Sequence, residues 1–402
     1  MTRRDGLRVI LGTSAMALAM PARLTFAAPL QAKDNSQKRL VVVMLRGALD
    51  GLAAIPAPGD PAWADLRGHA EAILRSDALA AASAAGISAG LPAAQTAALP
   101  LDGIFTMHPA LVNLHKWYSQ KELIVAHAVA SPYRERSHFD AQQLLESGGD
   151  RPFVQSTGWL GRALQSSGQT AMALTASMPF ALRGSDGAST WTPAGRASNH
   201  QDLVMRVAQM YGNDAPLSNA LYKAIDQQDM SMGVKDGVGL AALARQAGKF
   251  LADSKGPKVA WLEAGGWDTH TQQFGRLSRL LLNLDEALAA LRSELGSQWG
   301  TTTVLVITEF GRSATLNGTG GTDHGSAGVA FLAGGEVAGG RVVSDWPGVA
   351  RAQLLDGRDL RPTLDIRRLI SAVVQHQFGL SKSGIENTFP GAPSGLTDLY
   401  RV

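Results

Sequence analysis

Carboxylates and histidines occur together on glycine-rich turns that follow apolar segments of the chain. Asp268 and His270 come directly after Gly265-Gly266 and are separated by one residue. In an extended segment, residues two positions apart project to the same side, so this carboxylate and this imidazole can reach one ion. Zinc accepts both ligand types and often keeps one coordination position open for water or substrate. The pair therefore indicates a metal site, although Asp268 or Thr269 could instead cap a following helix.

Three further segments carry the same kind of side chain. Glu309 follows an apolar run that reads as a strand, and open α/β sheets bind ligands at the carboxyl ends of their strands. Asp323 and His324 could both be metal ligands, or Asp323 could orient His324. Asp50 lies on a glycine-bounded turn after the first apolar run. Each also has a simpler explanation: an ion pair of Glu309 with Arg312, a flexible glycine loop, or a turn-forming aspartate.

Ser137 and His138 indicate a second kind of chemistry, at the expected N-terminus of a helix. Free amide groups and the helix dipole favour an anion such as phosphate or sulfate there. Ser137 could act as a nucleophile that a metal activates, while Arg46 and Arg312 could clamp anionic oxygens through paired hydrogen bonds. The alternative is an N-cap serine beside a histidine that protein partners satisfy.

Other residues that match a catalytic pattern are better explained structurally. Ser88 lies in a Gly-x-Ser-x-Gly sequence, but the surrounding segment is rich in alanine and no expected strand precedes it. A nucleophile elbow requires a strand, a tight turn and a helix, so we do not expect Ser88 to be catalytic. His108, His115 and His127 lie in apolar periodic segments, and we expect them to be packed rather than catalytic.

Strands that alternate with long helices must hold these candidates. Continuous apolar runs predict strands buried on both faces, and periodic patterns predict helices over 272–295 and 364–378. The alternation predicts an α/β fold with a mostly parallel sheet sandwiched by helices. Residues around 60–100 and 150–235 are expected to be insertions, the second of them helix-rich, in a single domain over 28–402. The expected strands are 40–45, 123–130, 258–264, 302–308 and 328–333.

The N-terminus has the layout of an export signal over residues 1–27. Arg3 and Arg4 precede a short, weakly apolar stretch, and Thr25-Phe26-Ala27 is the best cleavage site. The stretch is too short and too rich in small residues for a good membrane span, although an uncleaved anchor is the alternative. We therefore expect a periplasmic protein, exported by the twin-arginine route, with no stable membrane span after cleavage.

Charge and cysteine content exclude several classes of protein. The whole chain has a formal charge of +3 and a pI of about 9.2. The first 28 residues already carry a net +3, so the remainder is near neutral and we expect no nucleic-acid partner. The absence of cysteine excludes disulfides, thiolate metal sites and a cysteine nucleophile. The residues behind the N-terminal charge are Arg3, Arg4, Arg8 and Arg23 against Asp5.

Five motifs together resemble the exported bacterial domain-of-unknown-function family fifteen-oh-one, over nearly all of the mature chain. That family looks related to the alkaline phosphatase and sulfatase superfamily. The relation implies an α/β sheet between helices, with a metal site at the strand ends. The motifs are Leu45-Arg46-Gly47-Ala48-Leu49-Asp50-Gly51, Arg136-Ser137-His138-Phe139-Asp140, Gly265-Gly266-Trp267-Asp268-Thr269-His270, Thr308-Glu309-Phe310-Gly311-Arg312 and Gly321-Thr322-Asp323-His324-Gly325.

The resemblance also implies roles for individual residues. Asp50 matches the first-strand carboxylate ligand, Glu309 the carboxylate on a later strand, and Ser137 the position of the superfamily's nucleophile. The paired ligands of one metal match Asp268 and His270, and the last histidine ligand matches His324.

The chain departs from the superfamily pattern at two of these positions. One residue rather than three separates the aspartate from the histidine of the pair. The carboxylate on the later strand is Glu309, and Phe310 rather than a histidine follows it. Either one metal position is therefore missing or His138 fills it.

From these residues and this resemblance we expect a metal-dependent, hydrolase-like protein that acts on phosphate or sulfate esters. The substrate would be a small anionic ester or a sulfated or phosphorylated glycan. Histidine ligands favour zinc or manganese over magnesium as the divalent ion. The alternative is a non-catalytic periplasmic protein that keeps the fold and binds a glycan or a protein partner.

Overall fold

The computed structural model describes residues 37–68, 98–192 and 239–401. The expected signal over 1–27, Ser88 and a large part of both expected insertions lie outside the described residues. All described residues belong to one compact unit, Asp34–Val402. The expectation of an α/β fold can therefore be compared with these three ranges.

A nine-stranded, mostly parallel sheet forms the centre of this unit, as the alternating pattern predicted. Strand β1 (Arg39–Leu45) is buried along its whole length and pairs in parallel with β7 (Val259–Ala264) and β8 (Thr302–Thr308). Strand β9 (Gly328–Gly334) is antiparallel to β8 and to β4 (Leu123–Ala130). The order is β10-β4-β9-β8-β1-β7-β5-β6, with β11 beside β4. The short strands of this sheet are β5 (Ala171–Ala173), β6 (Ala188–Thr190), β10 (Arg341–Val343) and β11 (Leu364–Asp365).

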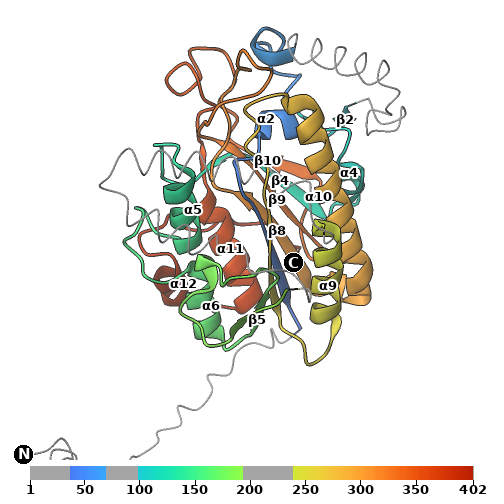
Figure 1. Cartoon of the computed structure of the whole chain (residues 1–402), viewed down its shortest axis with the longest axis vertical. Helices are drawn as coiled ribbons and strands as arrows, with labels where there is room; N and C mark the ends of the chain where they lie inside the picture. The colour runs from blue at the N-terminus through green and yellow to red at the C-terminus, as the bar shows by residue number, and fades with distance from the viewer. Residues whose placement is uncertain (1–36, 69–97, 193–238, 402) are drawn as a thin grey trace, which may run out of the picture. The chain divides into compact units, whose positions relative to one another are not determined.

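Helices cover both faces of the sheet (Figure 1). One face packs against α4 (Val112–Ser119), α9 (Leu240–Ala252) and α10 (Gln273–Leu295). The other packs against α6 (Trp159–Ser167) and α11 (Ile366–Phe378). Side chains of β1 alternate between the two cores, as a strand buried on both faces requires. Val41, Val43 and Leu45 join the first core, and Leu40, Val42 and Met44 join the second.

Several shorter elements complete the described part of the chain. They are α2 (Gly51–Ala54), α5 (His138–Ser147), α12 (Lys382–Thr388), the π-helical turn Ala64–Gly68, the 3₁₀ segments Phe180–Leu182 and Gly296–Thr301, and a small hairpin of β2 (Leu99–Pro100) and β3 (Thr106–Met107). Among the described residues, no helix combines the length and the apolar character that crossing a bilayer would require.

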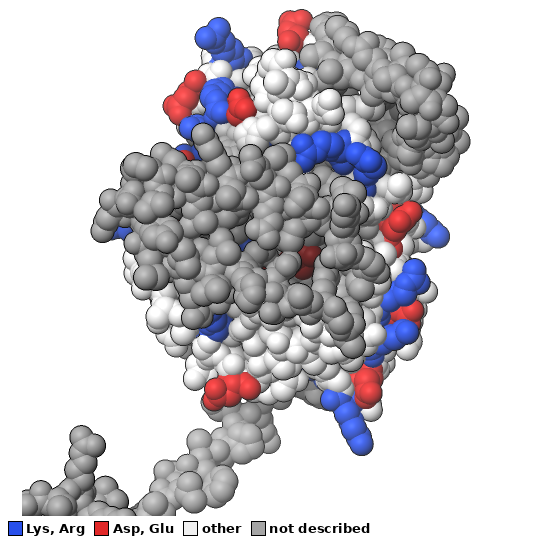
Figure 2. Space-filling model, viewed as in Figure 1, with Lys and Arg blue, Asp and Glu red and all other residues white. Residues whose placement is uncertain are grey.

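Charged side chains of both signs are interspersed along the face that α9 and α10 present (Figure 2). Such mixing is ordinary for a solvated helix surface and creates no extended field of one sign on that face.

The loops with the candidate residues meet at one edge of the sheet. Strands β1, β4, β7 and β8 run in the same direction, so their carboxyl ends lie at this edge. The loop after each of these strands contains one of the motifs. Neighbouring strands are about 4.8 Å apart, which brings residues that are distant in sequence within reach of one another.

Candidate metal centre

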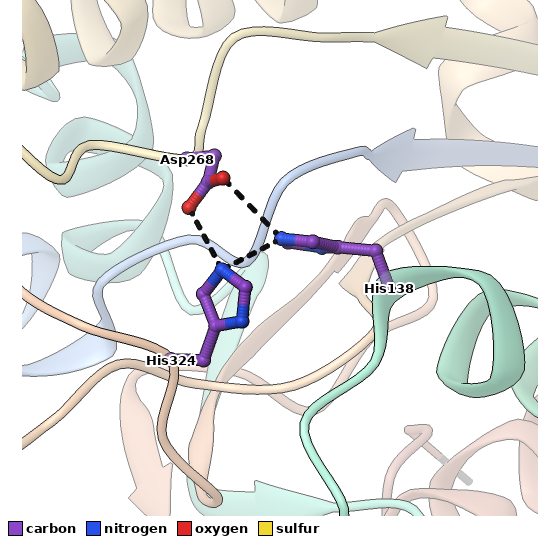
Figure 3. Close-up of side chains that lie close together, drawn as sticks. All are labelled: His138, Asp268 and His324. Carbon is purple, nitrogen blue, oxygen red and sulfur yellow. Dashed lines mark hydrogen bonds and ion pairs between the residues drawn. The ribbon is translucent and has the colours of Figure 1, made fainter. Parts of the chain in front are cut away.

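Three side chains from three separate segments of the chain point toward one another at this edge (Figure 3). His138 is the first residue of α5, Asp268 follows β7, and His324 lies between β8 and β9. The Nε2 atoms of His138 and His324 are 3.0 Å apart. Asp268 places Oδ2 3.4 Å from the first of these nitrogens and Oδ1 3.3 Å from the second. These three residues form a group that could hold a metal ion.

His270 lies beside this group. Its Nε2 is 3.0 Å from Oδ1 of Asp268 and 3.0 Å from Nε2 of His324. The alternative that Asp268 or Thr269 caps the next helix is wrong, because α10 begins at Gln273 and its N-cap is Gln272. The four residues His138, Asp268, His270 and His324 are called the cluster below.

Hydrogen bonds on the far side of each imidazole decide which nitrogen faces the cluster. Nδ1 of His324 is 3.0 Å from the main-chain oxygen of Arg136, which can only accept, so this Nδ1 carries the proton. Nδ1 of His138 is 2.8 Å from Oε1 of Glu309. In the neutral imidazoles, two Nε2 lone pairs therefore face each other at 3.0 Å. That contact is repulsive unless a cation, either a proton or a metal ion, lies between them.

Charges around the cluster favour a cation at this place. Burial lowers the pKa of His138, but its hydrogen bonds with Asp268 and Glu309 outweigh burial and raise the pKa to about 10. Burial raises the pKa of Asp268, but hydrogen bonds with the three imidazoles hold it well below its usual range. Arg312 also donates to Oδ1 of Asp268. The ion-free cluster thus binds a proton tightly, and a metal ion would have to displace that proton.

The donor set fits a divalent transition metal. Zinc bonds to histidine nitrogen and carboxylate oxygen are about 2.0–2.2 Å long, which in a tetrahedral site places neighbouring ligand atoms about 3.3–3.6 Å apart. The five separations that join Asp268 and His324 to each other and to the other two imidazoles are 3.0–3.4 Å, at or just below this spacing. Imidazole ligands suit zinc, and carboxylate ligands also suit manganese.

Glu309 lies behind the cluster rather than in it. Its side chain is fully buried, and Oε1 accepts hydrogen bonds from Nδ1 of His138, the amide of Gly47 and the side-chain amide of Gln142. Burial raises the pKa of Glu309, but its bonds with His138 and Gln142 lower it to about 2. Glu309 was expected to be a metal ligand, with an ion pair to Arg312 as the alternative, and Arg312 pairs instead with Asp268. A carboxylate that accepts from the far nitrogen of a metal-facing histidine orients that ring and strengthens it as a ligand.

Asp50 was expected to be a ligand, but the structure does not place its carboxylate in the cluster. Both of its oxygens lie 2.9 Å from Nη1 of Arg67, and Oδ2 accepts a 2.6 Å hydrogen bond from Gln273. Oδ1 also accepts from the amide of Ala53 and caps the first turn of α2. Donors therefore occupy every direction from which an ion could approach. The turn-forming alternative describes Asp50 better.

Arg46 and Arg312 do not present free guanidinium groups to an anion. Arg46 donates to Glu146 and Glu263 at 2.8 and 2.6 Å, and to Gln142 at 2.7 Å. Arg312 is buried against Asp268 and also donates to Thr322. The expected anion clamp is therefore not preformed in either side chain.

Two expected site residues, Ser137 and Asp323, lie next to the cluster. Ser137 occupies the N-cap position of α5, but its side chain makes no capping bond, and it is instead hydrogen-bonded to Tyr133. Oδ1 of Asp323 is 3.3 Å from Nδ1 of His270, and the side chain is half exposed. Asp323 thus orients His270, whereas the sequence suggested His324.

Close main-chain contacts explain part of the motif sequences. Gly47 has φ +116°, and a Cβ atom there would lie 2.6 Å from the amide nitrogen of Asp268. Only glycine allows the turn after β1 to approach the loop that carries Asp268. Arg312 and His324 are antiparallel bridge partners, which aligns these two side chains.

Sequence reasoning missed two residues that support the cluster. Gln142 lies one helical turn after His138 on α5 and donates to Glu309, and this i, i+4 spacing could have identified it. Arg136 contributes a main-chain oxygen, and it has an unusual φ of +60° that no sequence pattern predicted. Its guanidinium pairs with the buried Asp359.

The three histidines expected to be packed are held by protein partners. Nε2 of His127 donates to the main-chain oxygen of Ile55, and His127 is fully buried. His108 accepts from the amide of Ala110, and Nε2 of His115 is 2.8 Å from the oxygen of Pro100.

Solved structures similar to this chain include a member of the superfamily that the motifs implied. A protein in the alkaline phosphatase superfamily from Vibrio parahaemolyticus is 11% identical, with a TM-score of 0.41 over 90% of this chain and 72% of that one. Ps i-CgsB is 12% identical, with a TM-score of 0.40 over 86% and 73%. The C-terminal periplasmic domain of EcEptC from Escherichia coli, in complex with Zn, is 8% identical, with a TM-score of 0.37 over 76% of each chain. These likenesses are too distant to assign a residue or a reaction to this chain.

No curated protein is similar to the chain in sequence. A family model described as "Protein of unknown function (DUF1501)" matches residues 37–389, and the chain belongs to that family, as its motifs predicted.

Proposed function

We propose that this protein binds a divalent metal ion, zinc or manganese, through His138, Asp268, His270 and His324. We further propose that it is a metal-dependent hydrolase of phosphate or sulfate esters, acting on a small anionic ester or on a sulfated or phosphorylated glycan. The resemblance of the five motifs suggests the ester class, and the cluster supports the metal.

One observation carries the metal proposal. Nε2 of His324 lies 3.0 Å from Nε2 of His138 and also 3.0 Å from Nε2 of His270. A proton can satisfy one of these contacts, since a proton is shared between two atoms only. A metal ion accepts several lone pairs at once, and His138, Asp268 and His324 form the group that could hold it, with His270 beside them.

The residues around the ion would divide the work of ester hydrolysis. The ion would supply Lewis acidity, which polarises an ester oxygen and lowers the pKa of a nearby hydroxyl group or water. Glu309 would keep Nδ1 of His138 protonated and the ring in place. Ser137, directly before His138, is the candidate nucleophile. Its hydroxyl group is not used to cap α5.

We also propose that the chain is exported to the periplasm by the twin-arginine route. The support is Arg3 and Arg4 ahead of a weakly apolar segment. This route suits proteins that fold before they cross the membrane, which fits a metal centre assembled from three segments that are distant in sequence.

A specific observation favours the non-catalytic alternative. The guanidinium groups of Arg46 and Arg312 are both occupied by protein carboxylates. An anionic ester would therefore meet fewer free cations than hydrolysis of phosphate or sulfate usually requires. A protein that keeps the ion and binds a glycan or a partner without turnover would show this arrangement too.

Metal analysis followed by turnover assays tests the proposal. The protein, purified with zinc or manganese present, should carry about one ion per chain. Less than about a tenth of an ion per chain would contradict the proposal that it binds a metal. The loaded protein should hydrolyse an aryl phosphate or an aryl sulfate. Ser137→Ala should remove that activity but retain the ion, while Ser166→Ala, on the exposed surface of α6, should change neither. A retained ion without turnover on either ester would support the non-catalytic alternative.

A further inference from the structure

The cluster residues differ in how firmly the protein holds them. His138 is bonded to Glu309, and the Glu309 side chain has no solvent exposure. Asp268 accepts from Arg312, whose side chain is likewise not exposed. Buried partners of this kind cannot exchange their hydrogen bonds with water, so both ligand side chains are held in place.

His324 is held by the main chain. Its Nδ1 donates to the oxygen of Arg136, and the Arg136 guanidinium pairs at 2.8 Å with Asp359, whose side chain is not exposed. Moving the His324 ring would leave a main-chain acceptor without its donor, which is costly where water is excluded. His138, Asp268 and His324 therefore form a rigid set of three.

His270 is held much more weakly. Its Nδ1 bonds to Asp323 at 3.3 Å, and the Asp323 side chain is 52% exposed. The His270 side chain itself is 42% exposed, whereas those of His138, Asp268 and His324 are 15, 21 and 27% exposed. Water can replace a hydrogen bond at such a surface at little cost in free energy.

The main chain at His270 is nevertheless fixed. Its carbonyl oxygen accepts from the side chains of Asn317 and Thr319 at 2.9 and 2.8 Å. Gly321 packs so closely that a Cβ atom there would lie 2.1 Å from this oxygen. The imidazole can therefore rotate about its side-chain bonds without breaking any main-chain contact. A mobile ring on a fixed main chain is the arrangement that reversible coordination requires.

We propose that His270 is an exchangeable ligand. Its ring leaves the ion and opens one coordination position to a small oxygen or nitrogen donor, while His138, Asp268 and His324 retain the ion. Three protein ligands with one open position is the arrangement of catalytic zinc sites, and four protein ligands close a site. The proposal rests on the metal binding proposed above, and it assigns the open position to a named side chain.

Replacing the native ion with cobalt(II) allows a test of whether His270 leaves the ion, because the visible absorption of cobalt(II) reports changes in its coordination. Affinity is measured by competition with a chromophoric chelator for wild type, His270→Ala and His324→Ala. We expect His270→Ala to keep one ion with an affinity within about 100-fold of wild type, the range typical for loss of a supporting group. His324→Ala should weaken binding well beyond that range. Circular dichroism of each variant verifies the fold, and His270→Asn replaces the alanine variant if that one does not fold.

Azide titration then identifies the ligand that leaves. The spectrum of cobalt-loaded wild type at saturating azide should coincide with that of azide-treated His270→Ala, because both then have the same three protein ligands. Wild type that does not respond to azide, or a different final spectrum, would overturn the proposal. An azide-free spectrum of His270→Ala identical to wild type would also overturn it, since His270 would then not be a ligand.

The outcomes separate this inference from the proposed function. Wild type that binds neither zinc nor cobalt overturns both. Wild type that binds one ion, with His270→Ala losing it as completely as His324→Ala, overturns the inference alone and leaves the metal centre standing.

Discussion

Asp50 and Asp268 follow neighbouring strands of one sheet and were both expected to be metal ligands, yet the structure gives them opposite surroundings. Asp50 is 1% exposed, and Arg67, Gln273 and the amide of Ala53 saturate its oxygens. We call Asp50 and these partners the closed region. Asp268 is partly exposed and faces imidazole nitrogens, although Arg312 also donates to it. We call the cluster, to which Asp268 belongs, the open region.

The comparison teaches that the partners of a carboxylate, and not its position after a strand, decide whether it can bind a metal. Donors around Asp50 leave no lone pair for an ion, so the group stabilises the fold. Lone pairs that face one another around Asp268 and His324 need a cation, so the fold holds a binding site there at some cost in stability.

The largest expected effect separates the two regions directly. Asp50→Ala should remove the carboxylate that pairs with the buried Arg67 and lower the free energy of unfolding by about 3–5 kcal/mol. Asp268→Asn should instead lower metal affinity by about 100-fold or more, with a change of about 1 kcal/mol or less in the ion-free protein. Urea denaturation of chelator-treated protein and a metal titration measure the two quantities. The distinction fails if Asp50→Ala is as stable as wild type but loses the ion.

The second prediction concerns the pH dependence of stability that His127 causes. This histidine bonds to Ile55 at the end of α2, the helix that Asp50 caps. Burial lowers the pKa of His127 to about 4 and outweighs the hydrogen bond from Nε2 to Ile55, which raises it. Nδ1 accepts from the amide of Ala128. The folded protein thus keeps His127 neutral while the unfolded chain takes up a proton near its ordinary pKa of about 6.5. Stability should therefore fall as pH decreases from about 6.5 to 4, by about 3 kcal/mol for this residue.

The control for this titration is His127→Phe, which keeps an aromatic ring between Phe105 and Trp346. Other groups also titrate in this range, so the informative quantity is the difference in pH dependence between variant and wild type. Equal slopes of the unfolding free energy between pH 6.5 and 4 would show that His127 is not held neutral.

The smallest expected effect sharpens the description of the open region. Glu309→Gln preserves the size of the side chain but removes the charge that holds Nδ1 of His138. Metal affinity should fall by about 10- to 100-fold, the usual loss when a group that orients a ligand is changed. Glu336→Gln, a carboxylate bonded to Lys38 and His376 away from the cluster, is the matched control and should leave affinity unchanged. Isothermal titration with zinc measures both, and an unchanged affinity in Glu309→Gln would mean that the carboxylate does not tune the site.

The sequence by itself determined the fold class and the edge of the sheet where the polar residues meet. Continuous apolar runs such as 40–45 and 302–308 allow only strands buried on both faces, and parallel strands put their following loops at one edge. The grouping of His138, Asp268, His270 and His324 follows from this rule, because each lies just after a strand or on the loop that follows one.

Only the tertiary structure decided what each polar group meets at that edge. Sequence spacing could not show that Arg67 reaches Asp50, or that Glu309 turns away from the cluster and accepts from His138. Nor could it show that Arg46 and Arg312 are occupied by carboxylates. The physical reason is that the two kinds of interaction join residues at different separations along the chain. Strand and helix patterns depend on neighbours within a few residues, whereas hydrogen bonds act over about 3 Å between atoms that only the packed chain brings together.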